Sequence, residues 1–209
     1  MTLRFSLPFV ICFALVLGAG AACAVPIYTF TDLGTLGGSS SYACSLNDAG
    51  QVAGYSYTAG AVMHGFEYSG GSMSDLGTLG GSTSYARGIN ETGQIVGYST
   101  ITTGATRAFL YSGGTMNNLG TLGGNGSWAY GISDNGKIAG YSTTSTGNSR
   151  AFLYSGGSMS DLGTLGGNGS WAYGVNDAGK VVGSSYHTAG LFQDHAFLYS
   201  GGSMSDLGT

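Results

Sequence analysis

Residues 75–117 read DLGTLGGSTSYARGINETGQIVGYSTITTGATRAFLYSGGTMN, and this 43-residue stretch decides the fold because the chain repeats it. The segment Leu-Gly-Thr-Leu-Gly-Gly follows Asp32, Asp75, Asn118 and Asp161, and a fifth start begins at Asp206. These starts lie 43, 43, 43 and 45 residues apart. The sequence therefore contains four repeats, at 32–74, 75–117, 118–160 and 161–205, and a partial one at 206–209.

The turn residues divide each repeat into four predicted strands. In the second repeat the strands are expected at 85–89, 94–98, 107–111 and 115–119. Asn90 to Gly93 reads as a turn, because Asn bonds its own backbone and Gly accepts positive φ. Gly113-Gly114 reads as a two-residue hairpin turn, and a polar loop is expected at 100–106. The Gly-rich segment would then lead into the next repeat.

Four short antiparallel strands in this length are typical of a β-propeller blade. A lone blade buries too little apolar surface, so sister blades must cover it. Small and aromatic residues recur at fixed places, which indicates close packing between layers: Ala43, Ala86, Ala129 and Ala172; Gly54, Gly97, Gly140 and Gly183; Phe66, Phe109, Phe152 and Phe197. The predicted fold is an all-β, propeller-like array of four four-stranded antiparallel blades.

Ile27 to Leu33 reads as one strand more than four blades need. The ring could therefore be closed, or incomplete and open, and the chain could be part of a longer array. Open strand edges invite pairing with another chain, so self-association of a matrix-like protein is one hypothesis.

The N-terminus has the pattern of a signal peptide over residues 1–24. Arg4 is followed by an apolar run from Phe9 to Leu17 and by small residues ending in Ala22-Cys23-Ala24. The run is too short for a bilayer, which needs about 20 residues, so no membrane span is expected in the mature chain, 25–209. The expected location is extracellular, with the periplasm or cell surface as alternatives.

Cleavage would change both the cysteine count and the charge. Cys44 alone would remain, so no internal disulfide could form. Arg4 is one of 6 basic residues, and its loss lowers the formal charge from −4 to −5. An acidic chain is a poor nucleic-acid partner, because phosphates require a basic surface.

The repeat resembles the bacterial extracellular HAF repeat family, named for a His-Ala-Phe triplet. The triplet is intact at His195-Ala196-Phe197, and 175–183, Val-Asn-Asp-Ala-Gly-Lys-Val-Val-Gly, is similar to a second family segment. The resemblance implies an exported, propeller-like protein with no established common activity. Some members have a C-terminal surface anchor, which this sequence does not show.

The recurring polar residues predict turns rather than a metal or catalytic site. Asp48, Glu91, Asp134 and Asp177 recur in the first turn, where each carboxylate is expected to cap its own turn. His64 and His195 share a repeat position with Arg107 and Arg150, which indicates a donor at the start of the third strand. No catalytic residues, metal ligands or cofactor are assigned.

The positions where repeats differ are the candidate binding site. Cys44, Arg87, Tyr130 and Tyr173 share one position, and Tyr42, Tyr85, Trp128 and Trp171 share another. The residues singled out are Arg87, Tyr130, Tyr173, Trp128 and Trp171. The favoured function is a non-catalytic binding or scaffold module with an unknown extracellular ligand, such as a glycan. The alternatives are an extracellular polysaccharide hydrolase and the self-assembling matrix protein.

Overall fold

The structure is a computed structural model that describes residues 29–187 and 194–208. The predicted signal peptide, 1–24, lies outside the described residues. The chain divides into two compact units, Met1–Asp32 and Leu33–Thr209, and all the strands lie in the second. Among the described residues, no helix is long and apolar enough to cross a membrane.

Leu33–Thr209 contains four antiparallel sheets of four strands, and each strand pairs with its neighbours in the sequence. The first sheet comprises β1 (Gly37–Leu46), β2 (Val52–Thr58), β3 (Met63–Ser69) and β4 (Ser72–Asp75). The second comprises β5 (Gly80–Ile89), β6 (Ile95–Ile101), β7 (Thr106–Ser112) and β8 (Thr115–Asn118). The third comprises β9 (Gly123–Ile132), β10 (Ile138–Thr144), β11 (Ser149–Ser155) and β12 (Ser158–Asp161). The fourth comprises β13 (Gly166–Val175), β14 (Val181–His187), β15 (Asp194–Ser200) and β16 (Ser203–Asp206).

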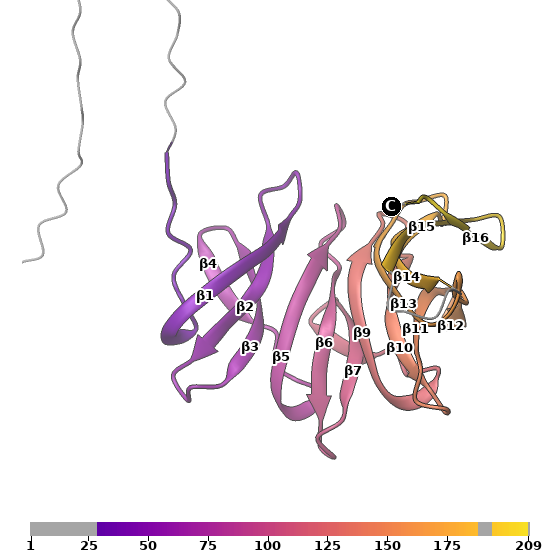
Figure 1. The fold of residues 1–209 in the computed structure, drawn as a ribbon. Helices are drawn as coiled ribbons and strands as arrows, with labels where there is room; N and C mark the ends of the chain where they lie inside the picture. Colours follow the sequence, from indigo (N-terminus) through magenta and orange to yellow (C-terminus); the bar gives the residue numbers. More distant parts are fainter. Residues whose placement is uncertain (1–28, 188–193, 209) are drawn as a thin grey trace, which may run out of the picture. The chain divides into compact units, whose positions relative to one another are not determined.

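This meander confirms the predicted all-β, propeller-like architecture, and Figure 1 shows the sheets following one another in chain order. The first strand of each sheet is longer than the sequence predicted. In the second repeat it begins at Gly80, whereas Tyr85 was expected. Register shifts between Gly80 and Ser84, and between Ala86 and Gly88, bend the strand. These bends let the Gly-rich segment pair with β6 as part of β5, although a Gly-rich composition is more typical of turns.

The extra N-terminal strand is a second difference. Residues 29–36 carry no strand, and Ile27 and Tyr28 lie outside the described residues. A strand is stable only where it has a partner in a ladder. Among the described residues, β15 pairs with β14 and β16, so no place beside it is left for another strand.

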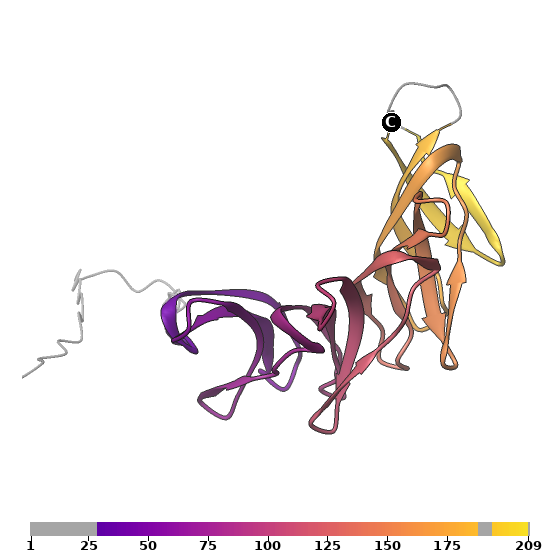
Figure 2. The ribbon, with the colours of Figure 1, turned by 90° about the horizontal axis from the view of Figure 1, so that it is seen from below.

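The core lies between consecutive sheets rather than within any one of them. Three apolar clusters fill the three junctions. Figure 2 shows the sheets that border these junctions, which the colours distinguish in chain order. At the second junction Val96 of β6 meets Ala129, Ile138 and Phe152 of the next sheet. Phe152 is fully buried, as are its counterparts Phe66, Phe109 and Phe197. Each sheet is therefore stabilised by its neighbour, as the size of the repeat predicted.

The invariant strand glycines have a steric cause. A Cβ on Gly97 would overlap the carbonyl oxygen of Tyr85 on the paired strand β5. Gly140 and Gly183 meet the same obstacle at Trp128 and Trp171. The close approach expected at these glycines is confirmed, and the close neighbour is the backbone of the paired strand in the same sheet.

The roles of Glu91, Asp134 and Asp177 were predicted wrongly, because these first-turn carboxylates bond across the junctions. The Glu91 N–H donates to Oδ1 of Asp134 at 3.0 Å, and the Asn135 N–H donates to Oδ1 of Asp177 at 3.0 Å. The turn itself is held by an Asn side chain, as when the Gln94 N–H donates to Oδ1 of Asn90 at 2.9 Å. The first turns of consecutive sheets lie close enough for a carboxylate of one turn to accept a hydrogen bond from the backbone of the turn before it. The spacing of these residues in the sequence does not reveal that the turns are neighbours.

Candidate functional site

A row of aromatic side chains crosses all four sheets on their first and second strands. The register explains it, because Tyr42 lies opposite Tyr55, Tyr85 opposite Tyr98, and Trp128 opposite Tyr141. We call this set the aromatic row, and it consists of Tyr42, Tyr55, Tyr85, Tyr98, Trp128, Tyr130, Tyr141, Trp171, Tyr173 and Tyr186.

Ring contacts link the row within each sheet and across each junction. Tyr85 stacks on Tyr98 with their centroids 5.0 Å apart, and Trp128 stacks on Tyr141 at 4.7 Å. Across the junctions, Tyr55 meets Tyr85 edge-on at 5.1 Å. Farther along the row, Tyr98 meets Tyr130 at 6.4 Å. These separations fall in the range where aromatic pairs attract beyond simple burial.

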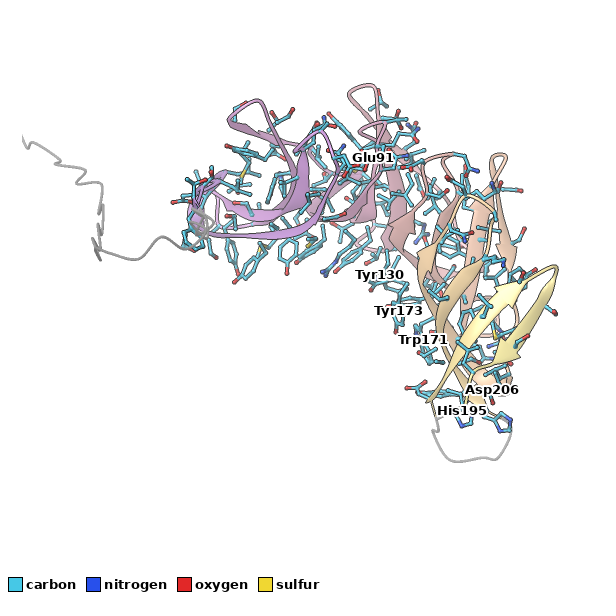
Figure 3. All side chains as sticks on the ribbon, turned by 90° about the horizontal axis from the view of Figure 1, so that it is seen from above. Glu91, Tyr130, Trp171, Tyr173, His195 and Asp206 are labelled. Atoms are coloured by element: carbon cyan, nitrogen blue, oxygen red, sulfur yellow. The ribbon has the colours of Figure 1, made fainter. Side chains whose placement is uncertain are left out.

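Four of the five residues singled out from the sequence belong to this row, and the fifth, Arg87, lies against it. Tyr130 lies between Tyr141, at 5.9 Å, and Tyr173, at 5.8 Å. Figure 3 shows Tyr130, Tyr173 and Trp171 projecting side by side from the same side of the ribbon. Trp128 joins through Tyr141, while Arg87 inserts among the tyrosines of the first two sheets. Variable positions in four separate repeats thus form one continuous surface.

Arg87 supplies a positive charge beside the aromatic row. Its Nη2 donates to the Tyr98 hydroxyl at 2.7 Å, and its Cζ lies 5.1 Å from the Tyr55 ring centroid and 5.4 Å from that of Tyr98. Burial alone would lower the pKa of Arg87, but the bond to Tyr98 and the nearby Tyr55 and Cys44 outweigh burial and raise this pKa above its ordinary value. Arg87 therefore stays charged.

Three phenols of the row, those of Tyr85, Tyr130 and Tyr141, stay neutral at ordinary pH. Burial raises the pKa of Tyr130 well above its usual 10.0, and the adjacent Tyr141 raises it further. Burial also raises the pKa of Tyr141 and of Tyr85. Neutral phenols both donate and accept hydrogen bonds, so the row offers polar groups as well as apolar faces.

The row widens into a hollow of about 330 Å³ at its C-terminal end. Tyr130, Tyr141, Trp171, Tyr173 and Tyr186 form its aromatic lining, and Ser184 and Asp194 complete it. Trp171 pairs with the small Ser184 across the strands, where the other sheets have Tyr at the second-strand position. Replacing that ring by a serine opens space beside Trp171.

Two features of the row were missed from the sequence. The second-strand tyrosines, Tyr55, Tyr98 and Tyr141, were not singled out, although pairing each first strand with its hairpin partner would have found them. No strand was predicted for the Gly-rich segment, but Gly126 and Gly169 of that segment lie in β9 and β13. A Cβ on either would collide with the indole of the tryptophan two residues later. Glycine there makes room for tryptophan.

The recurring His and Arg positions lie outside the row and act as donors, as predicted. Nη1 of Arg107 donates to the Asn125 carbonyl of the next repeat at 2.8 Å. His195 instead pairs with Asp206, at 2.7 Å between Nδ1 and Oδ2. Figure 3 shows His195 and Asp206 apart from Tyr130, Trp171 and Tyr173 of the row. Among the described residues, no cluster of three His, Cys, Asp or Glu side chains could hold a metal ion.

Comparisons with known proteins identify the fold. No family model and no curated protein sequence matches the chain. A solved TolB-like protein from Agrobacterium tumefaciens is similar, with a TM-score of 0.56 and 14% identity over 79% of this chain and 68% of its own. The fold is propeller-like. A triple arginine-to-alanine mutant of AofleA from Arthrobotrys oligospora aligns less closely, with a TM-score of 0.44 and 14% identity over 80% of this chain and 56% of its own.

Proposed function

We propose that the chain is an exported, non-catalytic binding module whose aromatic row binds a neutral glycan. The observation that supports this proposal is the convergence of the variable repeat positions on one continuous aromatic surface. A scaffold that keeps its core constant while varying one surface is typical of repeat proteins that bind ligands.

The chemistry of the row fits a sugar ring. One face of a pyranose is formed by C–H groups, which pack on an aromatic ring, while its edge carries hydroxyls. Tyrosine and tryptophan combine an apolar face with a polar atom at the rim. The hollow beside Trp171 and Tyr173 is within the size range of small-ligand sites, about 300–1,000 Å³. Rings repeated from sheet to sheet suit a chain of sugars better than a single residue.

Binding is favoured over hydrolysis by the acids near the row. A glycosidase needs two carboxyl groups about 5–10 Å apart at the scissile bond. Of the described residues that line the hollow, one is a carboxylic acid, Asp194. The first-turn acids are engaged at the sheet junctions, where Asp134 and Asp177 accept backbone N–H groups. The hydrolase alternative remains a sequence-based hypothesis.

Affinity electrophoresis through gels containing xylan, laminarin or hydroxyethyl cellulose tests the proposal. At least one of these neutral polysaccharides should retard the purified chain. Tyr173→Ala should weaken that interaction about tenfold, the loss expected for one ring contact. Tyr173 is 52% exposed, so its removal should leave the fold intact.

Phe30→Ala is the matched control, because it removes an aromatic ring that is 99% exposed and outside the row. Retardation that is equal in both variants, or no retardation in any gel, would count against the proposal. Release of reducing ends during the run would instead support the hydrolase.

A further inference from the structure

The two ends of the array expose surfaces that are buried at every internal junction. Val96 and Ala139 are fully buried, whereas Val182, at the same place in the fourth sheet, is 46% exposed. Leu119 and Leu162 are 8% and 7% exposed, whereas Leu207 is 60% exposed. We call the exposed side of the fourth sheet the forward face.

The first sheet exposes the opposite side of the same kind of junction, here called the rear face. Ala86 is fully buried, and its counterpart Ala43 is exposed. Ile89 is 7% exposed, and its counterpart Leu46 is 72% exposed. The rear face of one sheet is what covers the forward face of the sheet before it, at all three internal junctions.

We propose that the forward face of one chain binds the rear face of a second copy of this chain, head to tail. The internal junctions show how the apolar groups would meet. Ile132 packs near Gly88 and Val96 of the preceding sheet. Leu46 of a second copy therefore fits against Gly174 and Val182, which line an apolar hollow of about 330 Å³ on the forward face.

The hydrogen-bonding groups of the two faces are also complementary. At the internal junctions a turn N–H donates to a carboxylate one sheet later, as from Asp48 to Glu91 at 3.1 Å. On the forward face the Asp177 N–H is the equivalent donor. On the rear face of a second copy the Asp48 carboxylate is the equivalent acceptor.

Two further hydrogen bonds between the copies are inferred in the same way, from equivalent bonds at the internal junctions. Nζ of Lys137 donates to the Asp177 carbonyl at 2.9 Å, so Lys180 would reach the Asp48 carbonyl of a second copy. The Ala151 N–H donates to Oγ of Ser170 at 2.9 Å, so the Ala196 N–H would meet Ser41. Ser41 already donates its own proton to the Gly34 carbonyl at 2.6 Å, as Ser170 does to Gly163, which leaves its oxygen free to accept.

This interface is heterologous, because it joins two different surfaces. The proposal does not rest on glycan binding by the aromatic row, and this interface differs from pairing through strand edges. Sedimentation velocity or light scattering from micromolar to millimolar concentration should show that the mean mass of the purified chain rises with concentration.

Substitution of each face separately provides the decisive test. Val182→Asp blocks the forward face and Leu46→Asp blocks the rear face, and both side chains are exposed in the single chain. Each variant alone should bind itself at least tenfold more weakly, because it would bury an unpaired charge. An equimolar mixture should form dimers and nothing larger, since one intact face of each kind remains. Ser158→Asp, an exposed charge on β12, should associate like the unmodified chain.

A purified chain that stays monomeric throughout would overturn the proposal. So would association that persists in both aspartate variants, which would point to the strand edges. A mixture of the two variants that forms no dimer would show that the faces do not recognise each other.

Discussion

The backbone N–H of Glu91 and the carboxylate of Asp134 form a 3.0 Å hydrogen bond between residues in the same place in consecutive repeats. The first turn of one sheet is thereby tied to the first turn of the next. A carboxylate that recurs in every repeat can thus hold consecutive sheets together. Its contribution to the stability of the fold depends on the presence of a preceding sheet whose backbone it can bind.

That dependence predicts unequal effects of one substitution in two repeats. Asp134→Ala should lower the free energy of unfolding by about 1 kcal/mol, because a backbone donor loses its charged acceptor. Asp48→Ala should change it by less than about 0.5 kcal/mol, because the first sheet has no preceding sheet among the described residues. Urea denaturation measures both. Equal losses would show that the carboxylates act within their own turns.

The strand glycines should tolerate no side chain. Gly97→Ala should lower the free energy of unfolding by about 3 kcal/mol, because its Cβ would overlap the Tyr85 carbonyl oxygen. Gly60→Ala is the control, since its nearest neighbour would be Oγ1 of Thr58 at 3.6 Å. Thermal unfolding of the two variants should differ clearly, and similar melting temperatures would refute the steric explanation.

The His195–Asp206 pair predicts a pH dependence. The Gly208 N–H, then His195, lowers the pKa of Asp206 below its ordinary 3.8. The folded chain is therefore stabilised at pH values above the unfolded pKa, and this contribution is lost as the pH falls through the lowered value. His195→Ala should raise the pKa of Asp206 without restoring 3.8, because the Gly208 bond remains.

A carbon-detected NMR titration of Asp206 measures this change. His64→Ala removes the equivalent partner of Asp75, at 2.8 Å, and should leave the Asp206 titration unaltered. An Asp206 pKa that is the same with and without His195 would contradict the assignment.

Much of the fold could be predicted because the same pattern of strand and turn residues occurs in all four repeats. Gly97 and its counterparts indicated a close backbone approach, and Asn90 with Gly93 placed a turn correctly. The start of β5 at Gly80 was missed, because two register shifts let glycines join a ladder that their propensity disfavours. The prediction of a strand at 27–33 was wrong for residues 29–33, because a strand-like sequence does not by itself supply a partner strand.

The residues singled out from the sequence lie close together in the structure, but the extent of the aromatic row was not predicted. Arg87, Tyr130, Tyr173, Trp128 and Trp171 stood out because they vary on a constant scaffold. Their union into one row depends on which sheet packs beside which, and that is a tertiary relationship. The cross-junction contacts, such as Tyr98 with Tyr130, therefore required the structure.

Tryptophan fluorescence tests the aromatic row most directly, because Trp128 and Trp171 are the 2 tryptophans of the chain and both belong to it. Xylohexaose, laminarihexaose and cellohexaose would each be titrated into the purified chain. The account predicts a saturable change in emission with at least one of them, and a weaker apparent affinity in Tyr173→Ala. An emission spectrum that none of the three oligosaccharides alters would contradict it.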